Sequence, residues 1–117
     1  MHAFDILGDP VRRCLLELLS AGELSAGELT AVAQERFGIS QPAVSQHLRV
    51  LRDNGFATVR PEGTRRLYSL EAGPMREIDT WLQHYRPLWE QRLDALATEL
   101  KRGQRKTPHP PQKKKDT

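Results

Sequence analysis

Polar side chains that can read DNA bases recur on one face of the segment from Ser40 to Gly55. Val44, Leu48 and Leu51 are spaced by four and three residues, so one face of a helix here would be apolar and point into a core. The opposite face carries Gln41, Ser45, Gln46 and Arg49. Short polar groups and a long cation can reach base edges and phosphates from a helix in a major groove. The alternative is an ordinary amphipathic helix whose polar face is only solvated.

A predicted β-hairpin follows this helix and places arginines near its turn. Residues 56–59 and 65–70 alternate apolar with polar side chains, and a Pro-Glu-Gly sequence at 61–63 supplies the turn. The arginines at or near the tip are Arg60, Arg65 and Arg66. Guanidinium groups there can lie against a phosphate backbone or enter a minor groove. Residues 36–66 contain six arginines and only two acids, so the local charge is positive.

The order and spacing of these residues resemble the ArsR-type (arsenic-repressor-like) winged helix-turn-helix repressors of bacteria. The family pattern is Ser-x-x-x-x-Ser-x-His-Leu-x-x-Leu-x-x-x-Gly, then a wing, then Tyr-x-Leu. It is matched by Ser40, Ser45, His47, Leu48, Leu51, Gly55, Tyr68 and Leu70. The resemblance covers about residues 4–100. It implies a mainly α fold with a small β-hairpin, a winged helix-turn-helix, and dimerisation through the N- and C-terminal helices.

Helix-capping residues predict two further helices before the helix at residues 40–55, which would be the recognition helix. Asp9 followed by Pro10 is a good N-cap and first-turn pair. Ser25 and Glu28 form a capping box for a second helix, which Gly38 should end. This second helix would be the first of the helix-turn-helix.

An apolar seam along residues 74–101 predicts a long helix that pairs with a second copy of the chain. The seam consists of Met75, Ile78, Leu82, Tyr85, Trp89, Leu93, Leu96 and Leu100. One small domain cannot cover so long a seam. The predicted dimer interface comprises Phe4, Leu7, Ile78, Leu82, Tyr85, Trp89, Leu93 and Leu96.

The tryptophans and the proline of this predicted helix allow a ligand pocket and a kink. Trp81 and Trp89 could instead line a ligand pocket. Pro87 removes one backbone hydrogen bond, so we expect a kink between residues 83 and 86.

Charge is divided unevenly along the chain. Residues 1–100 contain eleven arginines and fourteen acids, whereas residues 101–117 contain seven bases and one acid, so the net charge of +3 comes from the end. We therefore predict a DNA-binding and dimerisation domain over residues 1–102 and a disordered basic tail over residues 103–117. The tail is either a solubilising end or an arm that adds nonspecific DNA affinity.

No metal site is predicted. In ArsR-type metal sensors a thiolate motif lies on the helix that here spans residues 27–33, which has no cysteine, and Asp79 is followed by Trp81 where the other family site has histidine. Trp81 and the Tyr-Arg-x-x-Trp sequence at 85–89 resemble a family branch that lacks a metal site. Cys14 is expected to be a small buried hydrophobe.

Two histidines bear on the metal question. His47 on the recognition helix is expected to pack or to contact a phosphate. His84, with Glu77, Asp79 and Glu90 nearby in sequence, is the alternative: a weak intersubunit metal site.

Composition and missing motifs bear on the cellular location of the protein and on the enzyme and cofactor classes. A single cysteine, the absence of a secretory signal and the lack of a membrane-spanning stretch predict a cytoplasmic protein. No catalytic constellation or phosphate-binding glycine loop indicates an enzyme or a cofactor. The expected partners are operator DNA, near-palindromic in sequence, and a second copy, with an unidentified effector. The alternatives are a metal-responsive sensor with a non-standard site and a winged-helix module that binds only proteins.

Overall fold

The computed structural model describes residues 2–106, with side chains through Gly103. The chain forms two compact units, of which the first ends at Thr80 and the second begins at Trp81. The sequence predicted one DNA-binding and dimerisation domain over residues 1–102, and that boundary stays a prediction.

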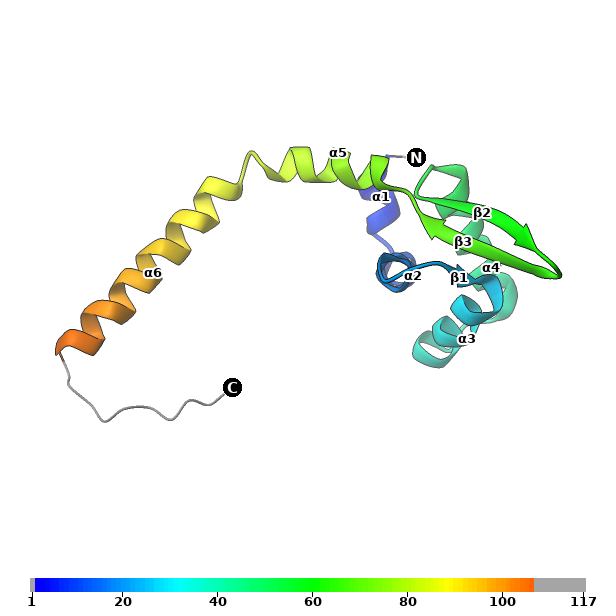
Figure 1. Cartoon of the computed structure of the whole chain (residues 1–117), viewed down its shortest axis with the longest axis horizontal. Coiled ribbons are helices and arrows are strands. Elements are labelled where there is room, and N and C mark those ends of the chain that lie inside the picture. The colour runs from blue at the N-terminus through cyan, green and yellow to red at the C-terminus, as the bar shows by residue number, and fades with distance from the viewer. Residues whose placement is uncertain (1, 107–117) are drawn as a thin grey trace. The chain divides into compact units, whose positions relative to one another are not determined.

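Helices dominate the first unit (Figure 1). They are α1 (Ala3–Leu7), α2 (Pro10–Ser20), α3 (Ala26–Phe37), α4 (Gln41–Asp53) and most of α5 (Ala72–Leu82). The predicted caps are confirmed: the Asp9 carboxylate accepts from the Val11 amide at 2.8 Å, and Ser25 with Glu28 forms a capping box. Gly38 ends α3 in the left-handed conformation, with φ of 65°, which explains the glycine there.

The sheet of the first unit has three antiparallel strands in the order β1-β3-β2. They are β1 (Leu24–Ser25), β2 (Ala57–Glu62) and β3 (Arg65–Leu70). Figure 1 shows β2 and β3 as a long hairpin, the wing. The predicted turn at 61–63 is wrong by two residues, because Glu62 pairs with Arg65 and the turn is Gly63-Thr64. Pro61 is tolerated because β2 is an edge strand, where a missing amide costs no ladder bond.

The core of the first unit lies between the helices and the wing strands. Leu15 of α2, Leu29 of α3 and Leu51 of α4 are fully buried. Phe56, which precedes β2, is 1% exposed and donates its amide to the Leu51 carbonyl at 2.9 Å. The recognition helix and the start of the wing are therefore fixed to one core.

The second unit contains α6 (Arg86–Lys106). The predicted single helix with a kink is wrong: α5 ends at Leu82 and α6 begins at Arg86, with a turn over residues 83–85. The position of the break was predicted, and Pro87 explains it. Its ring has no amide to donate to the carbonyl of Gln83 and clashes with that group in a continuous helix.

α6 continues four residues past the expected domain boundary. Residues 103–106 of the predicted tail are helical, and the rest of that tail, residues 107–117, lies outside the described residues. Within residues 2–106, no helix has both the length and the apolar character needed to cross a membrane.

Candidate nucleic-acid interface

The recognition helix α4 begins and ends where its cap residues require. The Ser40 hydroxyl accepts from the Ala43 amide at 3.3 Å, and Pro42 occupies the first turn, where its missing amide costs nothing. After α4, Gly55 has φ of 80°, a conformation that favours glycine. The chain can therefore turn from the helix directly into the wing.

One face of α4 is buried and the other is exposed, as predicted. Val44 and Leu51 are fully buried, and Leu48 is 3% exposed. The exposed positions include Gln41, Ser45, Gln46 and Arg49. The structure thus presents four of the predicted DNA-contacting side chains together on one accessible helix face.

His47 lies at the edge of that face and is half-buried. Its Nδ1 is 3.5 Å from Nη1 of Arg12 on α2. A guanidinium can only donate, so this hydrogen bond requires Nδ1 without a proton and leaves Nε2–H as the ring's donor. The Arg12 side chain also donates to the carbonyls of Ile6 and Asp5, each at 3.0 Å. Arg12 therefore joins the end of α1 to the recognition helix.

Asp9 holds the start of α2 beside Arg12. Partial burial raises its pKa, but hydrogen bonds from the Arg12 and Val11 amides and the positive charge of Arg12 outweigh this, so the pKa of Asp9 is lowered. The carboxylate is thereby kept ionised at the N-terminus of α2, where the helix dipole also favours it.

Arg60 is held by a carboxylate rather than extended from the wing tip. Its Nε and Nη2 each lie 3.0 Å from the carboxylate of Glu23, which also accepts from the Ser69 hydroxyl at 3.1 Å. The hydrogen bond from Arg60 lowers the pKa of Glu23, and the same bond raises the pKa of Arg60. Arg60, predicted at or near the wing tip, is thus paired with a carboxylate of the same unit.

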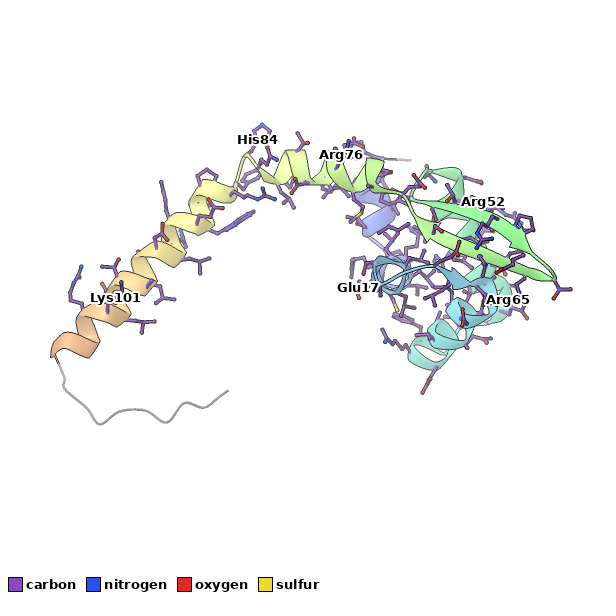
Figure 2. All side chains as sticks on the ribbon, viewed as in Figure 1. Glu17, Arg52, Arg65, Arg76, His84 and Lys101 are labelled. Atoms are coloured by element: carbon purple, nitrogen blue, oxygen red, sulfur yellow. The ribbon has the colours of Figure 1, made fainter. Side chains whose placement is uncertain are left out.

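The other two wing arginines differ in their surroundings. Nη2 of Arg65 is 3.8 Å from Oε1 of Glu28, whose carboxylate also caps α3. Arg66 is exposed, and within residues 2–103 no carboxylate lies within salt-bridge distance of it. Arg65 is labelled in Figure 2.

Sequence reasoning missed Arg52. This side chain is half-buried on α4 and lines a polar groove between that helix and β3, together with Ser45, Arg49 and Arg66. Figure 2 labels Arg52. Its position three residues after Arg49 and seven after Ser45 was the signal, because those spacings lie on one helix face.

The predicted dimer residues have unequal exposure. Ile78 is 7% exposed and packs within the first unit, so it offers little surface to a partner. Leu7 and Leu82 are half-buried. The exposed members are Phe4, Tyr85, Trp89, Leu93 and Leu96. Trp81 stacks at a tilt on Tyr85, with ring centroids 4.8 Å apart. The surface available for a partner is therefore concentrated on α6.

Metal-ligating side chains do not gather within residues 2–106, where no group of three or more His, Cys, Asp or Glu residues is placed to hold an ion. His84 Nδ1 lies 3.0 Å from the Trp81 carbonyl. Cys14 is buried, and its Sγ is 3.3 Å from Nη1 of Arg36. That no metal is needed stays a prediction.

The fold and this surface define a winged helix-turn-helix DNA-binding transcriptional regulator. A family model described as a helix-turn-helix domain matches residues 7–60. The chain is 37% identical over 96 residues to the HTH-type transcriptional regulator Rv2034 of Mycobacterium tuberculosis, covering 82% of this chain and 83% of that protein. It is 30% identical to the transcriptional repressor SdpR of Bacillus subtilis, covering 72% of this chain and 89% of that repressor.

A solved structure gives the same family. The crystal structure of an ArsR family transcriptional regulator superposes with a TM-score of 0.62 at 31% identity, covering 75% of this chain and 87% of that one. The chain belongs to the ArsR family of winged helix-turn-helix regulators.

Proposed function

We propose that this chain is a cytoplasmic, homodimeric transcriptional repressor that binds a near-palindromic operator. Each recognition helix would enter one major groove, and the two half-sites would be about one helical turn, ~10 base pairs, apart.

The observation that carries this proposal is the two-sided character of α4. Its apolar side is buried in the core, while Gln41, Ser45 and Gln46 are exposed beside a wing. A helix whose polar face is merely solvated has no need of an adjacent hairpin with exposed arginines. We assign Gln41, Ser45 and Gln46 to base edges, because amide and hydroxyl groups make the pairings that distinguish bases in the major groove.

The cations have a different role in the proposal. Arg49 lies on the same face of α4, where it can contact a base or a phosphate, and Arg65 and Arg66 contact the backbone from the wing. His47 would donate from Nε2 to a phosphate, since Nδ1 faces Arg12. Phosphate contacts supply affinity and register, whereas the polar side chains supply sequence preference.

Exposed apolar side chains on α6 support the homodimer. Trp89, Leu93, Leu96 and Leu100 are 41% to 62% exposed and are spaced by four, three and four residues. Such a stripe on one helix is typical of a coiled-coil seam, and its exposure in a monomer would favour aggregation. Pairing with a second copy buries it and couples two recognition helices, so that each half-site reinforces the other.

Selection of DNA fragments by the purified protein tests the proposal. Fragments of the source genome are incubated with the protein, the bound fraction is sequenced, and the enriched sites are footprinted. We expect a small set of sites with a near-palindromic pattern and two protected half-sites one turn apart. Retention of random fragments without a shared pattern, or no retention at moderate salt, would refute sequence-specific repression.

A further inference from the structure

We propose that the groove between α4 and β3 binds one phosphate of the DNA backbone, and that Arg49, Arg52 and Arg66 hold it together. This inference rests on the proposed function. It adds a defined ligand, a backbone phosphodiester, and a residue, Arg52, that positions the recognition helix without reading sequence.

The groove has a definite shape and composition. Its volume is about 260 Å³. It is lined by Ala26, Ser45, Leu48, Arg49, Arg52, Arg66 and Tyr68. Leu48 and Tyr68 are 3% and 6% exposed, so they form an apolar floor, while the guanidinium groups supply donors at the exposed side. Three elements of the first unit thus meet around one concave, donor-rich surface.

Charge balance distinguishes the groove arginines from Arg60. Arg60, which does not line the groove, is matched by the carboxylate of Glu23 at 3.0 Å, whereas Arg65 lies 3.8 Å from Glu28. Within residues 2–103, neither Arg49 nor Arg66 has a carboxylate at salt-bridge distance.

The positive charge of Arg52 is only weakly compensated by a nearby carboxylate. Its Nε lies 3.6 Å from the carboxylate of Asp53, the next residue, and both side chains are more than one-third exposed. Three guanidinium groups therefore line one groove with a single weak counter-charge. Like charges held together repel each other, so an anion bound among them is strongly favoured.

The ligand that fits is a phosphate. A guanidinium presents N–H donors in a planar fork that matches two oxygens of a phosphate. The groove joins the recognition helix to the central wing strand. A backbone phosphate held between α4 and β3 would fix the angle at which α4 enters the major groove of the DNA.

The first test replaces one groove arginine at a time. Arg52→Gln and Arg66→Gln are compared with Arg60→Gln, a matched control that removes the same charge from the wing outside the groove. Binding is measured by fluorescence anisotropy with the selected operator duplex and a scrambled duplex, over a range of salt, after thermal melting has verified the fold of each variant. We expect each groove variant to lose about tenfold in affinity for both duplexes, with the salt slope reduced by about one.

The control is expected to change affinity by less than about twofold, since Arg60 is matched by Glu23. Groove variants that bind both duplexes as tightly as the wild type, or that bind no more weakly than Arg60→Gln, overturn the proposal. Failure of the wild type to prefer the operator would instead refute the proposed function.

A double variant tests whether one phosphate is shared. If Arg52 and Arg66 hold the same phosphate, the variant that combines Arg52→Gln with Arg66→Gln should lose much less DNA affinity than the product of the two single fold-losses. Independent, multiplying losses would place the two arginines on different phosphates and overturn the shared site.

A competition measurement separates the two sources of phosphate. Millimolar inorganic phosphate should release the operator from the wild type no more than chloride at the same ionic strength does, because the ligand is a phosphodiester held within a duplex. Specific release by inorganic phosphate that Arg52→Gln abolishes would make the groove a site for a free anion, contrary to the proposal.

Discussion

Glu23 and Arg60 form a two-point ion pair, in which Nε and Nη2 of the arginine each lie 3.0 Å from a carboxylate oxygen. Glu23 precedes β1 and also accepts from Ser69 on β3, while Arg60 is on the edge strand β2. One carboxylate thus connects both wing strands to the segment before α3. The pair therefore adds an exposed contact between the wing and the segment before α3.

The pH dependence of stability should reveal this contact. The hydrogen bond from Arg60 lowers the pKa of Glu23 below its ordinary value of 4.5, so the folded state binds a proton less readily than the unfolded state. The stabilisation is therefore fully present above pH 4.5 and is lost as pH falls through the folded pKa. We expect Glu23→Gln to be less stable than the wild type at neutral pH, with the difference shrinking in acid. Urea unfolding measures this, and a difference independent of pH would contradict it.

Arg12 should stabilise the N-terminal helix. Because its guanidinium donates to the Ile6 and Asp5 carbonyls and lies beside His47, Arg12→Gln should lower the free energy of unfolding by about 1 to 3 kcal/mol. Arg76→Gln, which alters an exposed arginine on α5, is the matched control and should change stability little. Equal urea midpoints for the two variants would show that Arg12 does not dock α1.

Operator binding should not depend on a metal ion. We expect affinity to be unchanged in chelator and unaffected by equimolar zinc, cadmium or arsenite, because Cys14 is the only thiol and soft-metal sites need more than one. Electrophoretic mobility shifts with each addition provide the measurement. Release of the operator by any one of these ions would reveal a non-standard sensor site.

Dimerisation should depend on the exposed stripe of α6. Leu93→Glu combined with Leu96→Glu introduces two charges into the seam and should give monomeric or insoluble protein that has lost tight operator binding. Leu88→Glu is the control, because Leu88 is also exposed but lies off the stripe. Sedimentation of both proteins decides the matter. A seam variant that remains a soluble, operator-binding dimer would place the interface elsewhere.

Local signals in the sequence predicted the recognition helix well. The buried positions Val44, Leu48 and Leu51 lie within a few residues of one another, so helical periodicity is enough to place them. The same holds for the capping box that begins α3.

Contacts between distant residues were not predictable. Arg60 was expected near the wing tip, but its partner Glu23 is 37 positions away, and only the folded sheet brings the two together. The two-residue strand β1 has too little pattern to be recognised, and it forms because β3 offers a free edge. Arg52 was missed because its role depends on the wing lying opposite α4.

The most direct test of the central claim is the sequence preference of the exposed face of α4. Ser45→Ala and Gln46→Ala are compared with the wild type and with Gln34→Ala, an exposed control on α3, by measuring affinity for the selected operator and for a scrambled duplex. Each α4 variant should lose about 1 to 3 kcal/mol on the operator alone, because a base contact is removed while phosphate contacts remain. If both variants keep the wild-type ratio of operator to scrambled affinity, α4 does not read the DNA sequence.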